Sequence, residues 1–269
     1  MKNEPSFWDD GERKLADEFV RQGYVIRPTE SQADLDRIRD FIADCAAAWL
    51  KVPPATDKGK FLDNIHKSVE VAALNDLRLF VINRMTDAPW IRLAYFNTAR
   101  RALEVLVGNE LAMQLRINLS IQLPNDKSSL LPVHADVWAG DSPYEVVLWI
   151  PYVNVSKTKS MFILPRETDV AYQAKMEELK LKSSDDLYRA IKSDLIWLPI
   201  NYGEVLLFTQ NSMHGNVVNR EETTRWSSNC RFKSVFSPYH DKKLGEFFEP
   251  ILVRPATRLG AEYRLPSVV

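Results

Sequence analysis

Pro132-Val133-His134-Ala135-Asp136 is the stretch from which the fold can be predicted. We expect it to be a strand, so His134 and Asp136, two residues apart, should point to the same face of a sheet. An imidazole and a carboxylate side by side are two thirds of a 2-His-1-carboxylate iron site. His214, which lies much later in Met213-His214-Gly215-Asn216, is the candidate third ligand. The chain has only 4 histidines, and this pattern uses two of them.

Two later stretches alternate between polar and apolar residues, as strands with one buried face do. From Met113 to Leu123, apolar residues alternate with Arg116, Asn118, Ser120 and Gln122. From Arg225 to Phe236, one face carries Arg225, Ser227, Asn229, Arg231 and Lys233. A barrel that encloses a charged ligand needs such a polar lining. We therefore expect both polar faces to line the proposed metal site.

The order of the predicted elements indicates the fold class. Residues 1–108 follow mostly helical periodicity, including a long helix over 32–50, and they should form a helical support layer. About eight short strands follow. The sequence predicts a single domain over 1–269, mainly β, whose core is a double-stranded β-helix (a cupin-like jelly roll) over 109–239 that carries the metal site. Residues 240–269 should be a C-terminal extension.

Composition excludes several classes of protein. The formal net charge of -1 argues against general nucleic-acid binding, which requires a basic face. No run of eighteen apolar residues exists, so we expect no transmembrane segment, and the first residues lack the apolar core of a signal peptide. The two cysteines, Cys45 and Cys230, make no disulfide framework. These features suit a reducing cytoplasm, which we expect as the location.

The chain resembles the Fe(II)/2-oxoglutarate dioxygenases, in particular their phytanoyl-CoA dioxygenase-like branch. The resemblance spans most of the chain, but its specific part lies within 132–236. It is also similar to the hydroxylases of bacterial carbohydrate-biosynthesis clusters. One departure is Pro165-Arg166-Glu167-Thr168, where the family usually has Pro-Gly-Ser-His, so the substrate side differs from the family pattern. The matching segments are Gly23 to Ile26, His134-x-Asp136, Phe162 to Pro165, Gly203 to Phe208, His214 to Asn216, Asn219 and Arg225.

The resemblance implies a reaction and its cofactors. His134, Asp136 and His214 would hold Fe(II), 2-oxoglutarate would be the co-substrate, and O2 would be the oxidant. Arg225 would anchor the far carboxylate of 2-oxoglutarate through its planar fork of donors, with the Ser227 hydroxyl as a second donor; a surface ion pair with Glu221 or Glu222 is the alternative role for Arg225. Two weaker candidates for the same ligand are Asn118 and Arg116. The carboxylate of Asp136 argues for hydroxylation or a related oxidation, because related halogenating enzymes have a small residue there.

The predicted substrate is a small, polar and anionic molecule, with a sugar derivative as the first candidate. The positive charges for an anion would come from loops that could surround the mouth of the site, which carry Lys157, Lys159 and Arg166. Arg231 lies roughly 20 Å along an extended strand from Arg225, too far to contact the same small ligand, and Lys233 lies farther still. Trp138 could share the metal face or simply pack in the core.

Two other classes of function fit part of the pattern. A cupin-like metal isomerase, or a dioxygenase without 2-oxoglutarate, would use the same barrel but would not need Arg225 with Ser227. A non-catalytic jelly-roll module could bind a structural metal, although such a site is closed by four protein ligands and the sequence offers no fourth. Formation of succinate from 2-oxoglutarate would distinguish a 2-oxoglutarate-dependent oxygenase from these two classes. The sequence gives no indication of oligomeric state.

Overall fold

The computed structural model of the chain describes residues 7–179 and 183–266. Helix α1 (Asp10–Gln22) begins at a capping box, in which Asp9 and Glu12 each accept a hydrogen bond from the other's backbone N–H. It ends at Gly23, whose φ of 82° suits glycine. Strand β1 (Tyr24–Pro28) follows directly and pairs antiparallel with β7 (Glu204–Thr209). The start of the chain is thereby attached to the main sheet.

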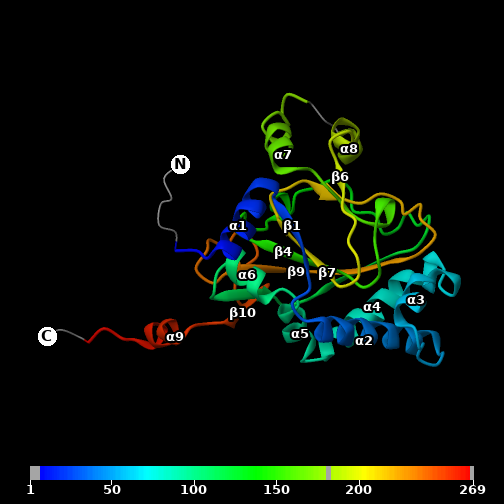
Figure 1. Cartoon of the computed structure of the whole chain (residues 1–269), viewed down its shortest axis with the longest axis horizontal. Helices are drawn as coiled ribbons and strands as arrows, with labels where there is room; N and C mark the ends of the chain where they lie inside the picture. Colours follow the sequence, from blue (N-terminus) through cyan, green and yellow to red (C-terminus); the bar gives the residue numbers. More distant parts are fainter. Residues whose placement is uncertain (1–6, 180–182, 267–269) are drawn as a thin grey trace.

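A layer of helices covers one side of that sheet, as the sequence predicted (Figure 1). Its longest member, α2, spans Gln32–Leu50 and buries Leu35, Ile38 and Ile42 at helical spacing. Those side chains join one continuous hydrophobic core with strand residues such as Leu148 and Trp226. The other helices of the N-terminal part are α3 (Lys58–Asp63), α4 (Val71–Asp87), α5 (Ile91–Asn97) and α6 (Arg100–Leu106).

The strands form two antiparallel sheets. In the larger sheet the order is β1-β7-β4-β9-β2-β10, and β3 pairs with β9 beside this path. The smaller sheet has the order β6-β5-β8. The predicted mainly β jelly roll with a helical layer is confirmed. Bounds not yet given are β2 (Leu111–Gln114), β3 (Asn118–Gln122), β4 (Val146–Pro151), β5 (Phe162–Ile163), β6 (Ile196–Trp197), β8 (His214–Gly215), β9 (Arg225–Ser234) and β10 (Phe248–Leu252).

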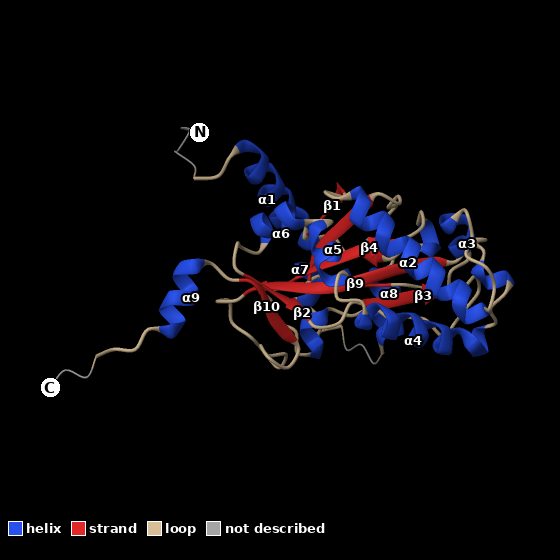
Figure 2. Cartoon of the chain, turned by 90° about the horizontal axis from the view of Figure 1, so that it is seen from below, coloured by secondary structure: helices blue, strands red, loops and turns tan. Residues whose placement is uncertain are grey.

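Three further α-helices lie in the second half of the chain. Helices α7 (Arg166–Gln173) and α8 (Ser184–Ile191) lie between β5 and β6, at the end of the molecule opposite α2–α5 (Figure 1). Leu187 and Ile191 of α8 pack with Phe162 and Met213 in a second, smaller hydrophobic cluster. Helix α9 (Pro255–Glu262) projects from the body beyond β10 (Figure 2). Over the described ranges, no helix is long and apolar enough to span a bilayer.

Three local predictions differ from the structure. Residues 132–136 are not a regular strand, because His134 makes an isolated bridge and Asp136 begins a 3-10 helix, η2 (Asp136–Ala139). The predicted strand over 113–123 is broken by a bend between β2 and β3, which exposes Leu115. The larger sheet also takes strands from outside 109–239, since β1 precedes this range and β10 follows it.

Candidate metal centre

His134, Asp136 and His214 meet at one point. One ligand atom from each of the three lies within 4.8 Å of the other two, and no other cluster of metal-ligating side chains occurs in the described residues. Asp136 and His214 are buried at 7% exposure each, whereas His134 is half-buried. The donor set of two imidazoles and one carboxylate is the facial triad typical of non-heme Fe(II) sites. It leaves room for further ligands, because three protein ligands do not close the coordination of iron.

Backbone hydrogen bonds join the two segments that carry these ligands. His134 N–H donates to the His214 carbonyl (3.1 Å), and His214 N–H donates to the His134 carbonyl (2.9 Å). Next to this bridge, Asn216 N–H donates to the Leu131 carbonyl (2.9 Å), and Leu131 N–H donates to Asn216 Oδ1 (2.7 Å). This two-residue bridge places His134 beside His214, although the two are far apart in the sequence and neither lies in a long strand. Gly215 permits it, because a Cβ there would lie 2.7 Å from the Leu131 carbonyl oxygen.

In both imidazoles, Nε2 is the nitrogen that could bind a metal. Nδ1 of His134 lies 2.7 Å from the Pro132 carbonyl, and Nδ1 of His214 lies 3.0 Å from the Ser212 carbonyl. A carbonyl oxygen only accepts, so Nδ1 must be the protonated nitrogen in each ring. The Nε2 lone pairs are then free to bind a metal, and the carbonyls hold the rings in orientation, as outer partners of metal-ligating histidines do.

Burial and neighbouring charges set the protonation of the triad. Burial lowers the pKa of His214 to about 4, against the opposing effect of Asp136. Burial would also lower the pKa of His134, but hydrogen bonds with Asp136 and the Pro132 carbonyl outweigh it and raise this pKa above its usual value. For Asp136, burial acts to raise the pKa, yet His134, His214 and Arg231 together lower it well below its ordinary range. At neutral pH the site holds a carboxylate and at least one neutral imidazole, which is the form that binds a metal.

Arg231 of β9 forms an ion pair with the carboxylate of Asp136. Asp136 Oδ1 lies 3.4 Å from His134 Nε2, whereas Asp136 Oδ2 lies 3.1 Å from the Arg231 guanidinium. From the sequence, Arg231 was expected on the polar face that lines the metal site but too far from Arg225 to contact the same small ligand. The contact of Arg231 with the metal ligand Asp136 was not predicted. Alternation along β9 already placed Arg231 on the polar face and was the signal for its role.

Arg225 and Ser227 lie on the same face of β9, deeply buried. Arg225 is 3% exposed, and its guanidinium donates to Ser120 Oγ (3.0 Å) and the Ser160 carbonyl (3.5 Å). Burial lowers the pKa of Arg225 to about 10. Within the described ranges Arg225 makes no ion pair, so the alternative of a surface pair with Glu221 or Glu222 is wrong. Its Nε and the Ser227 hydroxyl are buried polar groups without a hydrogen-bond partner in the described chain.

A cavity of about 430 Å³ connects these features. The triad and Arg231 line one part of it, and Ser120, which accepts from Arg225, lines another. Asn118 and Asn229, hydrogen-bonded to each other at 3.0 Å, lie on its wall. The remaining lining residues come from α4, from the loop before the triad and from β3, β4 and β7, namely Arg78, Leu79, Ile82, Leu119, Ser128 to Leu131, Val147 and Phe208.

Several predicted site residues lie elsewhere. Arg116 is exposed in the bend between β2 and β3 and is not part of the cavity wall. Lys159 is not a rim charge, because it is 5% exposed and pairs with Asp63 at 2.7 Å. Arg166 lines a different cavity beside α1, and Lys157 is exposed near Glu221. The remaining two also lie away from the cavity: Trp138 is 45% exposed on η2, and Lys233 is fully buried, where its ammonium donates to the Pro238 carbonyl and lies over the Tyr239 ring.

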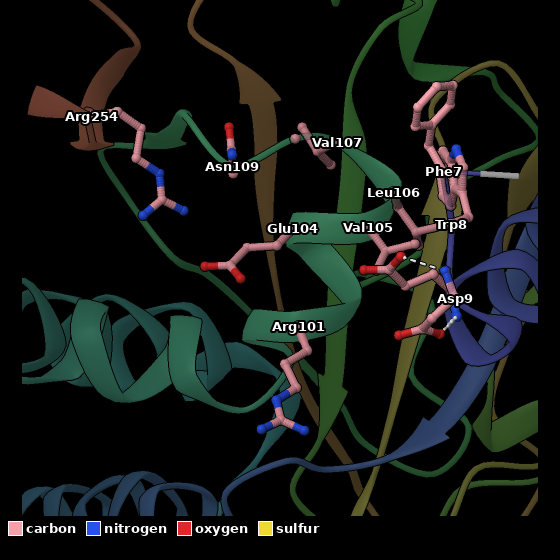
Figure 3. A pocket seen from close by; sticks show the side chains of 12 residues that line it. Phe7, Trp8, Asp9, Arg101, Glu104, Val105, Leu106, Val107, Asn109 and Arg254 are labelled. Carbon is pink, nitrogen blue, oxygen red and sulfur yellow. Dashed lines mark hydrogen bonds between the residues drawn. The ribbon is translucent and has the colours of Figure 1, made fainter. Parts of the chain in front are cut away.

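A larger cavity of about 780 Å³ lies apart from the triad, between the start of α1, helix α6 and Arg254 (Figure 3). Its lining includes Phe7 and Trp8 together with the charged side chains of Arg101 and Glu104. No residue of the triad borders it. The larger of these two cavities is therefore not the candidate functional site. The smaller one is, because the three metal-ligating side chains line it.

Comparison with solved structures identifies the fold. The non-heme monooxygenase ThoJ in its nickel complex aligns over 89% of this chain and 84% of its own, with a TM-score of 0.54 and 15% identity. EctD from S. alaskensis, solved with 2-oxoglutarate and 5-hydroxyectoine, aligns over 87% and 80%, with a TM-score of 0.57 and 16% identity. The fold is that of the non-heme 2-oxoglutarate oxygenases. HygX from Streptomyces hygroscopicus, solved with nickel and 2-oxoglutarate, covers 86% and 90% at a TM-score of 0.51 and 12% identity.

Sequence comparisons add no closer relative. No family model matches the chain, and no curated protein matches it in sequence. At 12–16% identity the likeness to the solved structures concerns the fold. What the site does must therefore be argued from its own residues.

The residues present fit Fe(II) and 2-oxoglutarate. The triad supplies the right donor types, and its imidazoles present Nε2. Arg225 is a buried cation without a carboxylate partner in the described residues, and one of its donors and the Ser227 hydroxyl are unused. A dicarboxylate would satisfy them, because an unpaired buried charge is costly.

Proposed function

We propose that this protein is an Fe(II)- and 2-oxoglutarate-dependent oxygenase of the phytanoyl-CoA dioxygenase-like branch. The observation that carries the proposal is the His134–Asp136–His214 triad, whose ligand atoms lie within 4.8 Å of one another in a cavity whose wall is hydrogen-bonded to Arg225. Bound iron would supply the activation of O2. Because Asp136 fills the third ligand position, hydroxylation is the reaction we propose. Two buried free cysteines suit the cytoplasmic location that we also propose.

The overall reaction balances without another reductant. One O2 oxidises one 2-oxoglutarate to succinate and CO2, and its second oxygen atom enters a substrate C–H bond to give C–OH. In this scheme Arg225 and Ser227 orient the far carboxylate of 2-oxoglutarate. Asn118 and Ser120 line the space between this anchor and the triad. The rest of the cavity would receive the substrate.

Succinate formation is the direct test of the proposed function. The purified protein, supplied with Fe(II), ascorbate, O2 and 2-oxoglutarate, should form succinate slowly even without its substrate. Asp136→Ala and His214→Ala should abolish this and should lower the bound iron measured after gel filtration. Lys157→Ala, an exposed change outside the cavity, is the control that should leave both unchanged. No succinate from the iron-loaded wild type would contradict the function and favour an enzyme that does not use 2-oxoglutarate.

The proposed substrate remains a small polar molecule, with a sugar derivative carrying an anionic group as the first candidate. Lys159 and Arg166 do not line the cavity, so the cation that we propose for substrate binding is a different residue, Arg78. Arg78 of α4 lines the cavity and donates to Asn75 (2.6 Å), and it makes no ion pair with any described carboxylate. The same cavity is lined by Leu79, Leu130 and Leu131, which are 36–50% exposed. A substrate that combines hydroxyl groups, an anionic group and an apolar face would match this mouth.

Substrate-stimulated succinate formation tests this part of the proposal. A panel of sugar phosphates, sugar acids, nucleotide sugars and the corresponding neutral sugars should contain compounds that raise the succinate rate. Arg78→Gln should raise the KM for an anionic member without changing 2-oxoglutarate affinity, and Lys157→Gln should not. Equal stimulation by a neutral sugar and its acid, in both proteins, would contradict a role for Arg78.

A further inference from the structure

The Asp136 carboxylate has two oxygens in different surroundings. Oδ1 lies on the triad side, 3.4 Å from His134 Nε2. Oδ2 lies on the far side, 3.1 Å from a terminal nitrogen of Arg231. Both residues are largely buried, with side-chain exposures of 9% for Asp136 and 13% for Arg231. One oxygen is therefore available to the metal while the other is engaged by a cation.

Arg231 itself is held in place on several sides. Its Nε donates to Gln210 Oε1 (3.0 Å), and its backbone N–H donates to Gln114 Oε1 (3.3 Å). Asp141 Oδ1 lies 3.0 Å from the same Nε, as a charge contact, because the single Nε hydrogen is directed to Gln210. Asp141 is 1% exposed and also pairs with Lys242, in the segment after β9. An alternating chain of charges thus runs from Asp136 through Arg231 and Asp141 to Lys242.

We propose that Arg231 is a positioning residue that keeps Asp136 a one-oxygen ligand of the metal. A free carboxylate can bind a metal through both oxygens, and the second would occupy a position that a chelating co-substrate needs. Holding Oδ2 on Arg231 removes that option. The guanidinium is suited to this because it stays charged and attracts Oδ2 at 3.1 Å. This inference rests on the proposed function, since it concerns how the same site keeps positions free for 2-oxoglutarate.

The fixed surroundings of Arg231 distinguish this role from substrate binding. Arg231 borders the cavity, but its guanidinium already lies against two carboxylates and two amide oxygens, whereas Arg225 has no carboxylate partner among the described residues. Asp141 contacts Arg231, and Lys242 contacts Asp141, so both support the position of Arg231 beside Asp136. Partners beyond the direct ligands typically change metal affinity or activity by about 10- to 100-fold when removed.

Two variants isolate the contact with Asp136. Arg231→Met alone would leave Asp141 buried beside Lys242 with one charge partner fewer, so misfolding could obscure the result. The double variant Arg231→Met/Asp141→Asn removes both charges together. Asp141→Asn alone keeps Arg231 on Asp136 and is the matched control. Arg231→Lys restores a cation without the planar fork and tests rescue.

The experiment measures 2-oxoglutarate binding to the Ni(II)-loaded proteins by calorimetry, without O2, so that no turnover is needed. The double variant should bind 2-oxoglutarate on the order of 10- to 100-fold more weakly than Asp141→Asn, and Arg231→Lys should bind with intermediate affinity. X-ray absorption of the Ni(II) forms without 2-oxoglutarate should show an additional carboxylate oxygen in the double variant only. Equal affinities and equal coordination in the double variant and its control would overturn the inference. Failure of wild-type protein to bind 2-oxoglutarate would instead overturn the proposed function.

Discussion

Arg225 and Arg231 lie six residues apart on one face of β9, and their surroundings are opposite. Arg231 lies between Asp136 and Asp141, so its charge is balanced by the chain itself. Arg225 is more deeply buried, is hydrogen-bonded only to neutral oxygens, and has a donor left over. A buried charge without a partner is unfavourable. The difference supports the proposals that Arg231 belongs to the structure of the site and that Arg225 binds an anionic ligand.

The largest expected effect is on stability at Arg231. Arg231→Met should lower the free energy of unfolding of the metal-free protein by about 3 kcal/mol, because it leaves two buried carboxylates without their shared cation. Urea denaturation followed by tryptophan fluorescence measures it. Arg13→Met is the control: its pair with Asp10 is exposed, so its effect should stay below about 0.5 kcal/mol. A loss at Arg231 no larger than at Arg13 would remove the distinction between the two arginines.

Arg225 should show the reverse pattern. Arg225→Gln should leave the stability of the metal-free protein unchanged or higher, since it removes an unpaired buried charge. It should weaken 2-oxoglutarate binding to the Ni(II)-loaded protein by about 1.5–3 kcal/mol, the typical loss for a charge-assisted hydrogen bond. Arg220→Gln, an exposed arginine close by, should do neither. If Arg225→Gln destabilises the protein but binds 2-oxoglutarate normally, then Arg225 is a structural residue.

The pH dependence of metal binding should report a single imidazole. The pKa of His214 is lowered to about 4, so its ring is already neutral above pH ~5, whereas the raised pKa of His134 keeps that ring partly protonated near neutral pH. Protonated His134 cannot bind metal, so affinity should rise with pH and level off only above the ordinary histidine pKa of about 6.5. Competition with a chromophoric chelator should give a slope of about one in log affinity against pH between roughly 5.5 and 6.5. A slope of two would mean that both rings titrate together.

The smallest expected effect concerns the glycine beside the third ligand. Gly215→Ala should weaken Ni(II) binding by a few fold, because its Cβ would meet the Leu131 carbonyl at 2.7 Å and push apart the bridge between His134 and His214. Gly260→Ala, where a Cβ meets nothing within 4 Å, is the matched control. Equal Ni(II) affinity in both variants would show that the bridge does not hold the ligands in position.

The sequence predicted the parts of the site that depend on pattern. Helix α2 and the polar face of β9 followed from periodicity, and the triad followed from residue type. The sequence did not predict the parts of the site that depend on tertiary packing. The pairing of Lys159 with Asp63 joins segments far apart in the chain, and the bend after β2 turns Arg116 outward. Short-range alternation cannot predict either feature, since both are decided by tertiary contacts.

The contact between Asp136 and Arg231 escaped prediction for a related reason. The sequence gives the distance between Arg231 and Arg225 along one strand. Asp136, however, lies in a 3-10 helix rather than in a regular strand, and its contact with Arg231 joins two segments far apart in the sequence. The face on which Arg231 lies was predictable, whereas its partner was not. Knowing that a polar face lines a barrel does not say which position along it meets the metal ligands.

The most direct test of the central claim is a crystal structure of the protein with Ni(II) and 2-oxoglutarate bound without O2. We expect one metal on His134, Asp136 and His214, with the far carboxylate of 2-oxoglutarate within hydrogen-bond distance of the Arg225 guanidinium and the Ser227 hydroxyl. We also expect Arg231 to contact Asp136 Oδ2 still. A metal bound elsewhere, or a 2-oxoglutarate carboxylate held by Arg231 while Arg225 keeps only its neutral partners, would contradict it.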